Sequence, residues 1–486
     1  MTGSKPTLRN LVSFGDVAAE DDAVLDYFLA TDAVRDIKDN RVFLVLGRKG
    51  AGKTAIVRHF SEGSADSVSR ALSLRGYPWN LHAQRIDRGA SDIEAYVSSW
   101  RFLLISQLAS LVLAKVGDGE DSAEARAIRE FFRENYGGPN VELSQLLRPQ
   151  RLRLSKLSFE PTVLGNKLGG VALERNPTDL GLGLELNALT DALFSGTMTV
   201  CSRHKLPPLL LHFDELDQGL SSLDEARSRM LIGLVLASRA LRREVQGTNA
   251  AVNAIVYLRS DLWDDLEFSD KNKISQTAAL HLTWDSDSLL RLVNARLQAR
   301  LSPASSWDNV AAADLMRGSQ TKWNHLLTRT FLRPRDVIRF LNAALERAKQ
   351  RVDEPLIFSN EDIVAAREPY SRYLKDELDD EILPHWHGWE EALQACSAIA
   401  TITFERDQFK TEYDSRRSAS NQVSADSALE FLYRFSVIGY ERRSGYGGSS
   451  WAFQYTDPEA GWDNSATRFK VHLGLKEYAR LREERR

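Results

Sequence analysis

The stretch VFLVLGRKGAGKTAIVRHF, residues 42 to 60, constrains the fold of this 486-residue chain more than any other segment. Residues 42 to 46 are apolar and β-prone, as expected of a strand that is buried on both faces of a parallel sheet. A glycine-rich loop follows at once, and residues 54 to 60 have helical spacing. Strand, loop and helix in this order predict an α/β domain built around a phosphate-binding loop.

The loop satisfies the pattern G-x-x-x-x-G-K-[ST]. Its glycines allow the backbone to curl so that N–H groups point at phosphate oxygens, and the start of the helix adds positive potential there. We expect Lys53 to reach the β- and γ-phosphates of ATP and the Thr54 hydroxyl to ligate Mg²⁺. The alternative is a glycine turn without a ligand. The loop residues expected to contact the nucleotide are Gly47, Lys49, Gly50, Ala51, Gly52, Lys53, Thr54 and Ala55.

A second apolar run, residues 209 to 213, ends in Asp214 and Glu215 and reads as another buried strand. Parallel α/β sheets place their ligands at this carboxyl edge. We expect Asp214 to hold Mg²⁺ through water, and Glu215 to orient and deprotonate the attacking water. A surface acid cluster after a core strand is the alternative. For Asp217 we favour a simpler role, as the cap of a helix that begins near Ser221.

A third predicted strand, within residues 253 to 263, ends in Arg259, Ser260 and Asp261. In ATPases with an extra strand between the two catalytic motifs, this neighbouring strand presents a polar side chain to the γ-phosphate. Arg259 is the candidate for that sensor. An ion pair at the end of the strand is the alternative.

Arg333 and Arg335 flank Pro334 at the start of a well-patterned helix that runs to about residue 348. An arginine at this position can pair with phosphate or with an acid of a neighbouring subunit. Ordinary solvated arginines are the alternative.

With these residues assembled, the chain resembles the AAA+ and STAND lineage of P-loop ATPases. More narrowly, it resembles a bacterial family with an FG…AAE box, a GRKGAGKT loop, and DELD, RSD and RPRD motifs, which begin here at Phe14, Gly47, Asp214, Arg259 and Arg333. The resemblance implies that Phe14 and Gly15 contact the nucleotide base. A packed N-terminal turn before a helix at residues 20 to 31 is the alternative.

The resemblance and the patterns together predict an α/β P-loop NTPase core with a parallel, AAA+-like sheet, a helical lid and a winged-helix-like C-terminal domain. The long separation of Thr54 from Asp214 indicates an insertion in the core. The expected parts are residues 1–40 with the base box, 41–284 for the core with its insertion at about 118–186, 285–370 for the lid and 371–486 for the last domain.

Within the insertion, residues 93 to 117 predict an apolar helix that packs internally, and residues 118 to 140 are charged and turn-rich. Residues 148 to 186 alternate basic and apolar side chains and predict a β-hairpin or short meander. Its basic residues can meet a phosphate backbone or an acidic partner, or form a solvated face; they are Arg148, Arg151, Arg153, Lys156 and Lys167.

The C-terminal part predicts an amphipathic helix, a strand, the glycine-rich turn ERRSGYGG and a returning strand, which together suggest a winged helix. Such a domain either packs on the ATPase and regulates it, which we favour, or binds DNA. His385 and His387 have H-x-H spacing, but no pattern of further ligands completes a zinc site, so packed or surface histidines are favoured.

Composition sets limits on partners and location. A formal net charge of −4 argues against a protein whose whole surface binds nucleic acid. Cys201 and Cys396 lie outside any metal or redox spacing, and no apolar run approaches the ~20 residues that span a bilayer. We therefore expect a cytoplasmic protein without a membrane partner. A nucleotide and either a second copy or a partner protein are the expected partners, and nucleic acid is less favoured.

The sequence thus predicts Mg²⁺-dependent ATP binding and hydrolysis that drives conformational or assembly switching, with a place in a bacterial defence or signalling system suggested by the resemblance. Two alternatives stay open. One is a nucleotide-gated binding module with slow turnover, and the other is a DNA-binding regulator that acts through the winged helix.

Overall fold

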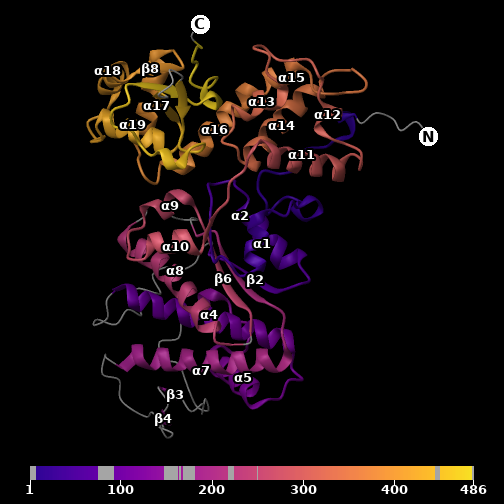
Figure 1. Ribbon diagram of the computed structural model, residues 1–486, viewed down its shortest axis with the longest axis vertical. Coiled ribbons are helices and arrows are strands. Elements are labelled where there is room, and N and C mark those ends of the chain that lie inside the picture. Colours follow the sequence, from indigo (N-terminus) through magenta and orange to yellow (C-terminus); the bar gives the residue numbers. More distant parts are fainter. Residues whose placement is uncertain are drawn as a thin grey trace, which may run out of the picture. The chain divides into compact units, whose positions relative to one another are not determined.

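The computed structural model describes residues 7–74, 92–146, 162–163, 166–167, 181–216, 224–248, 250–443 and 449–483. The chain divides into two compact units (Figure 1). The core unit comprises Ala30–Arg48 and Lys53–Leu282. The lid unit comprises Met1–Leu29, Lys49–Gly52 and Thr283–Arg486.

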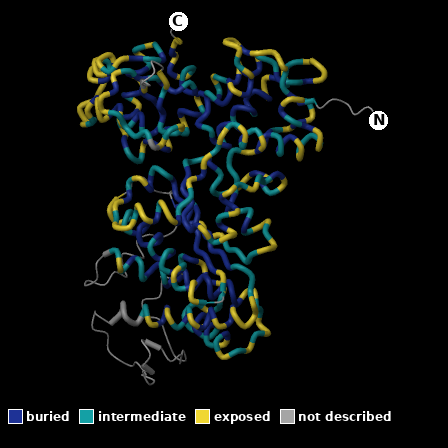
Figure 2. The backbone as a smooth tube through the Cα atoms, viewed as in Figure 1, coloured by how far each residue is buried: buried dark blue, intermediate teal, exposed yellow. Residues whose placement is uncertain are grey.

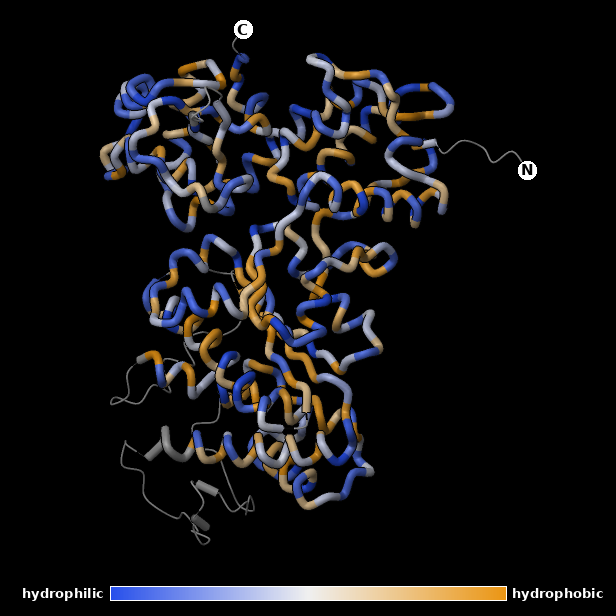
Figure 3. Tube along the Cα trace, viewed as in Figure 1, coloured by the Kyte–Doolittle hydropathy of each residue, from blue (hydrophilic) through white to orange (hydrophobic). Residues whose placement is uncertain are grey.

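A five-stranded parallel sheet forms the centre of the core unit, in the order β2-β5-β6-β1-β7. β6 therefore lies between β1, which precedes the glycine loop, and β5, which ends in Asp214, as the expected extra strand should. Every residue of β1, β5 and β6 is buried, and these strands are mostly hydrophobic (Figures 2 and 3). This is the predicted AAA+-like α/β core. The strand bounds are β1 (Leu44–Leu46), β2 (Val68–Ser73), β5 (Leu209–Asp214), β6 (Val252–Leu258) and β7 (Ala279–His281).

Helices cover this sheet, and the longest of them, α4, packs against α7 and α8. By length and composition, Ile93–Val116 of α4 could cross a membrane, but 78% of its most apolar window is buried inside the structure. The prediction of an internal core helix is confirmed. The helices of the core unit are α1 (Asp32–Lys38), α2 (Lys53–Arg58), α4 (Asp92–Val116), α5 (Ala123–Tyr136), α6 (Leu143–Leu146), α7 (Gly181–His204), α8 (Glu225–Val245), α9 (Ser260–Asp265) and α10 (Lys271–Thr277), with a π-helical turn at His59–Gly63.

Three local predictions about the core and its N-terminal approach are wrong. The segment 118–140, predicted to be turn-rich, contains α5, because Ser122 caps the helix and four apolar side chains line one face. The helix expected near Ser221 begins at Glu225 instead, with Asp224 as its cap. The helix expected at 20–31 is reduced to one 3₁₀ turn, Val24–Tyr27.

Most of the predicted basic meander lies outside the described residues. Asp217 lies outside them as well. The described part of the meander includes a short antiparallel pair, β3 (Thr162–Val163) with β4 (Asn166–Lys167), as a hairpin requires. The prediction is wrong at its C-terminal end, because α7 already begins at Gly181.

The first helices of the lid unit are short and pack around one hydrophobic core. α16 continues without a break across the boundary predicted at residue 370. The elements are the 3₁₀ turns η1 (Leu8–Asn10) and η2 (Val24–Tyr27), then α11 (Ser286–Arg300), α12 (Trp307–Val310), α13 (Lys322–Leu327), α14 (Pro334–Ala348), α15 (Asn360–Ala365) and α16 (Arg367–Ile382).

The last part of the lid unit has the element order of a winged helix: helix, strand, two helices and a pair of antiparallel strands. An additional strand, β11, completes an antiparallel sheet in the order β10-β9-β11-β8. The elements are α17 (Trp389–Ile399), β8 (Thr403–Glu405), α18 (Arg406–Arg416), α19 (Ala425–Arg434), β9 (Ile438–Arg443), β10 (Ser449–Ala452), η4 (Pro458–Ala460), β11 (Arg468–Val471) and η5 (Leu473–Leu475).

Candidate nucleotide site

The glycine loop leaves β1 at Gly47, whose N–H donates to the carbonyl oxygen of Leu258 in β6 at 3.2 Å. Gly50 and Gly52 have φ angles of +77° and +101°, in the left-handed region that favours glycine. The Lys53 ammonium donates to the carbonyl oxygens of Gly47 and Arg48, at 2.9 and 3.2 Å. The lysine is therefore held over its own loop, at the start of α2.

Thr54 and Asp214 come together from α2 and from the end of β5. The Thr54 hydroxyl lies near the Asp214 carboxylate, which is 7% exposed. Burial raises the pKa of Asp214, while the Thr54 hydroxyl and the charge of Lys53 act in the opposite direction. A desolvated carboxylate beside a hydroxyl is the kind of oxygen pair that a hard divalent cation accepts.

These two oxygens suit Mg²⁺ better than a cation that needs a full protein cage. In the part of the chain that the structure describes, no group of three or more His, Cys, Asp or Glu side chains is placed to hold a metal ion. Mg²⁺ characteristically takes one or two protein oxygens and completes its shell with waters and substrate phosphates. The donor set at Thr54 and Asp214 therefore fits the predicted cofactor.

Glu215 follows Asp214 with φ of +59°, a left-handed conformation that costs a non-glycine residue free energy. The turn brings its carboxylate to β2, where the Ser73 hydroxyl donates to it. Ser73 is the residue of β2 in register with Asp214. Both acids thus lie at the carboxyl edge of the sheet, as predicted, and Glu215 is held by a neighbouring strand.

Sequence reasoning missed a buried ring cluster beside Asp214. His212 lies two residues earlier on β5, stacks against Phe60 at 5.3 Å between ring centroids, and shares a hydrogen bond of 2.9 Å with the Tyr257 hydroxyl. Burial lowers the pKa of His212 to about 3, so the imidazole stays neutral. The signal was a lone histidine inside the apolar run 209–213.

Arg259 lies at the carboxyl end of β6, the strand between β1 and β5. It forms a bidentate pair with Asp261, with Nε–Oδ1 at 3.0 Å and Nη2–Oδ2 at 2.6 Å. The ion pair that we set out as the alternative is thus present. A role as phosphate sensor stays a prediction.

Arg333 is buried, so its interpretation as a solvated arginine is wrong. Its guanidinium is 2% exposed and pairs with Asp336 at 2.8 Å and with Glu381 of α16 at 2.5 Å. A further bond of 3.0 Å joins Nη1 to the carbonyl oxygen of Lys49 in the loop. The two carboxylates hold the pKa of Arg333 well above its usual range despite the burial.

Arg335 and Lys49 are held by the same helix. Arg335 Nη1 pairs with Glu377 at 3.1 Å, and Lys49 Nζ pairs with Asp380 at 2.7 Å and with Glu377 at 3.5 Å. Gly50 fits against Arg335 so closely that a Cβ there would lie 2.8 Å from the arginine Cβ. Three carboxylates, Glu377, Asp380 and Glu381, which we call the α16 acids, thus hold three of the cations expected near the phosphates.

The Phe14 ring is buried in the lid unit and stacks with Phe358, with 6.1 Å between ring centroids. Its main chain is fixed by Asn342 and Arg296, and Gly15 has φ of +107° with no room for a side chain. In this conformation the ring is not open to a nucleotide base, which favours the packed N-terminal turn.

A second contact to the loop was not anticipated. Trp284, the second residue of the last lid-unit segment, donates its indole N–H to the carbonyl oxygen of Ala51 at 2.8 Å. Its ring is also the nearest atom group to Gly52, at 4.0 Å from where a Cβ would lie. A lone tryptophan in a charged stretch gave no signal for this role.

His385 and His387 were predicted to be packed or surface histidines rather than zinc ligands. The His385 ring packs against Phe435, with 5.3 Å between centroids.

Residues 287–379 match a family model described as the FunZ-associated C-terminal helical domain. This range covers most of the lid helices from α11 to α16. None of the curated proteins matches the chain.

The chain is also similar to several solved structures. The Aeropyrum pernix ORC1 protein in complex with DNA has 12% identity and a TM-score of 0.39, with 96% of each chain covered. The Aeropyrum pernix ORC2 protein in its ADPNP–ADP complexes has 12% identity and a TM-score of 0.41, covering 92% of this chain and 90% of that one. CDC6P from Pyrobaculum aerophilum has 12% identity and a TM-score of 0.30, covering 92% and 91%. Similarity at this level says nothing about the ligands or activity of this chain.

Proposed function

We propose that this protein binds ATP with Mg²⁺ and hydrolyses it, and that the nucleotide state switches its conformation or assembly. The observation that carries the proposal is the placement of the Thr54 hydroxyl near the buried Asp214 carboxylate, close enough to lower the pKa of that acid against the effect of its burial. The hydroxyl at the end of the phosphate loop and the acid of the next catalytic motif thus lie at one place. A glycine turn without a ligand gives no reason to bury an acid beside that hydroxyl.

Each residue has a distinct role in this proposal. The backbone N–H groups of the loop and Lys53 hold the phosphates, and Thr54 and Asp214 hold Mg²⁺. The bound cation neutralises charge on the phosphates. Glu215 accepts a proton from the attacking water and orients it, which requires that its carboxylate be released from Ser73.

Turnover by the intact chain, compared with Lys53→Ala and Glu215→Gln, tests the proposal. We expect both variants to hydrolyse ATP at least about a hundredfold more slowly, since each removes a group that acts on the reacting phosphate or water. Glu215→Gln should still bind ATP with Mg²⁺, whereas Lys53→Ala should bind it weakly. Equal hydrolysis rates in all three proteins would sink the proposal.

A switch with slow turnover is the second candidate, and two observations favour it. Glu215 is tied to Ser73, and Lys49 and Arg335 are tied to the α16 acids. Groups that must leave one partner to reach a ligand slow the reaction. A single-turnover rate far below the rate of nucleotide exchange would support the switch over the enzyme.

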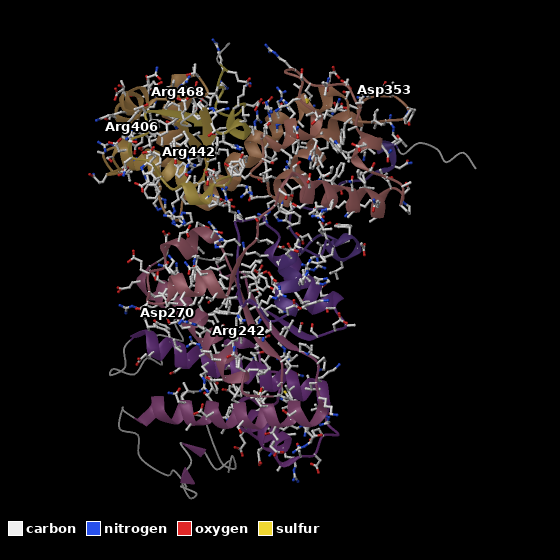
Figure 4. All side chains as sticks on the ribbon, viewed as in Figure 1. Arg242, Asp270, Asp353, Arg406, Arg442 and Arg468 are labelled. Carbon is white, nitrogen blue, oxygen red and sulfur yellow. The ribbon has the colours of Figure 1, made fainter. Side chains whose placement is uncertain are left out.

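For the C-terminal domain we propose a regulatory role rather than DNA binding. Three of its arginines, Arg406, Arg442 and Arg468 (Figure 4), are paired with carboxylates at 2.6, 3.2 and 3.7 Å. Paired arginines present less net charge to a phosphate backbone. Duplex DNA that binds with an affinity falling steeply as salt rises would contradict this part of the proposal.

For assembly, we propose self-association or a partner protein. Arg333 is engaged inside its own chain, so it is a poor candidate to reach a nucleotide on a second copy. The bacterial defence or signalling setting rests on the resemblance of the sequence motifs alone. Sedimentation with and without ATP would reveal nucleotide-dependent assembly.

A further inference from the structure

The main-chain carbonyl groups of the phosphate loop form a row of acceptors, and each of them receives a hydrogen bond. Lys53 holds the carbonyl oxygens of the first two loop residues, as described above. The next three carbonyl oxygens, those of Lys49, Gly50 and Ala51, receive their bonds from the lid unit, to which these three residues also belong. The lid unit therefore fixes the outer side of the loop.

A bond to a carbonyl oxygen also sets the direction of the next N–H group. The C=O of one residue and the N–H of the following residue lie in one planar, trans peptide unit and point to opposite sides. The bonds at Lys49, Gly50 and Ala51 thus direct the N–H groups of residues 50 to 52 away from the lid donors. These N–H groups are among those expected to meet phosphate oxygens.

The amino end of α14 supplies two of the three lid donors. Its first residue, Pro334, has no N–H, so Arg335 carries the first main-chain donor within the helix, which bonds to the Gly50 carbonyl oxygen at 3.4 Å. The Arg333 guanidinium reaches the Lys49 carbonyl oxygen at 3.0 Å. The positive end of the helix dipole thus faces carbonyl oxygens of the loop, which is the favourable arrangement.

Trp284 supplies the third donor and the shortest of the three bonds. Its indole N–H donates to the Ala51 carbonyl oxygen at 2.8 Å. An indole has one N–H and no acceptor, so this bond uses its whole hydrogen-bonding capacity. The half-buried ring packs against the hydrophobic core of the lid unit, and Gly52 lies within van der Waals reach of it. The lid core therefore fixes the ring, and the ring fixes the loop.

From these contacts we propose that Trp284 is a positioning residue for nucleotide binding. It holds the Ala51 carbonyl group, and with it the Gly52 N–H, in the orientation that accepts a phosphate oxygen. Arg333 acts in the same way at Lys49, through the loop and not on the phosphate itself. The inference rests on the proposed ATP binding, and it adds the lid unit as the part that prepares the phosphate loop for its ligand.

Trypsin cleavage after Lys49 measures the hold on the loop without any nucleotide, because the protease requires the loop to leave its bonds. We expect Trp284→Phe, which keeps an aromatic ring but has no N–H, to be cleaved there about fivefold faster than the wild type. Trp323→Phe is the matched control, because it loses an indole bond to the Ser286 hydroxyl elsewhere in the lid unit. Equal cleavage rates after Lys49 in the two variants overturn the proposal.

ATP binding and turnover test the consequence for the ligand. We expect Trp284→Phe to raise the Kd for ATP about fivefold while changing kcat by less than about twofold, because the loop holds the phosphates alike before and during the reaction. Trp323→Phe should bind ATP as the wild type does, since a general loss of lid stability is common to both variants. A fall in kcat with unchanged Kd contradicts the positioning role. Arg333→Met is a poorer test, because it also removes the partner of two buried carboxylates.

The two measurements distinguish failure of this inference from failure of the proposed function. A wild-type chain that binds no ATP contradicts the proposed function, and the cleavage rates then decide whether Trp284 holds the loop. A wild-type chain that binds ATP no more tightly than Trp284→Phe contradicts the positioning role alone.

Discussion

Glu215 shows how a single residue can be placed for one task and held back from it. Its left-handed backbone turns the carboxylate toward β2, and Ser73 donates to that carboxylate. A serine hydroxyl has one proton to donate, so this contact uses the one donor of the Ser73 side chain. The left-handed backbone and the hydrogen bond from Ser73 together fix the position of the Glu215 carboxylate, which is the proposed base.

Ser73→Ala is expected to raise the hydrolysis rate at saturating ATP, because the hydrogen bond from the Ser73 hydroxyl no longer holds the Glu215 carboxylate away from water. A hydrogen bond to a charged group contributes about 1.5–3 kcal/mol, so the expected rise is between about tenfold and about a hundredfold. Steady-state turnover checks it. Ser69→Ala is the control, since among the described residues the Ser69 hydroxyl shares its hydrogen bond with Ser67 and not with Glu215. A slower Ser73→Ala enzyme would mean that Ser73 positions Glu215 productively.

The Arg333 cluster gives a stability prediction at the same scale. Arg333→Met leaves the buried carboxylates of Asp336 and Glu381 without their shared cation, which should cost about 3–5 kcal/mol of unfolding free energy. Arg335→Met removes a more exposed pair and should cost about 1 kcal/mol or less. Urea unfolding of the two variants measures the difference. Similar losses would show that the Arg333 cluster is not specially dependent on its cation.

Residues close together in sequence were predictable at this scale, and partners far along the chain were not. The meeting of Lys53, Thr54 and Asp214 follows from two strand-end motifs in one parallel sheet. The burial of Arg333 depends on Glu381, on another helix, and no local pattern connects them. Phe14 is likewise packed against Phe358, a residue far along the chain that no local pattern connects to it.

Among the elements, α4 and α8 meet more closely than side chains normally allow. Gly233 of α8 lies against Tyr96 of α4, and a Cβ at Gly233 would come within 2.7 Å of the tyrosine Cβ. The indole of Trp100 donates to the Met230 carbonyl oxygen at 3.0 Å beside this contact. The glycine therefore sets how near the two helices approach.

Gly233→Ala should destabilise the protein, although glycine to alanine inside a helix normally stabilises by about 0.5–1 kcal/mol. The reason is overpacking, which typically costs about 1–3 kcal/mol. Gly119→Ala is the control, because nothing lies within 4 Å of the added Cβ. Melting temperatures decide the sign. A higher melting temperature for Gly233→Ala than for the wild type would show that α4 can move away without loss.

The sequence predicted helices and strands correctly where one periodic pattern was strong. It failed where two patterns in the same segment competed. The apolar run of α4 and the alternation of β9 and β10 were predictable from periodicity. α5 was missed because its charged residues hide four buried side chains on one face. The missing helix at 20–31 has a different cause: Asp22 is drawn into a buried pair with Arg296 at 2.9 Å, in a loop rather than a helix.

For the molecule as a whole, stability at acid pH depends on a buried histidine and not on the net charge of −4 alone. His325 of α13 is buried among Arg329, Arg367, Lys476 and Glu483, and burial with the arginines lowers its pKa to about 3. Arg367 donates to its Nε2 at 3.0 Å. A protonated imidazole has no acceptor for that bond. Protonation of His325 therefore opposes folding.

We expect unfolding free energy to fall as the pH drops from about 6.5, where the unfolded chain takes up a proton at His325, toward 3, where the folded chain does. His325→Gln removes this site and should flatten the decline between these values. His387→Gln, at an exposed position, should leave it unchanged. Urea unfolding across that range measures the slopes, and parallel slopes for all three proteins would contradict the assignment.

The division of the glycine loop has a consequence for how this protein can be taken apart. Lys49–Gly52 belongs to one compact unit and its flanking residues belong to the other, as Met1–Leu29 belongs with Thr283–Arg486. The polypeptide thus passes between the units four times. No single cleavage, natural or engineered, yields two self-sufficient halves, and a fragment beginning after Leu282 would lack the N-terminal segment that supplies Phe14 and Asp22 to its core.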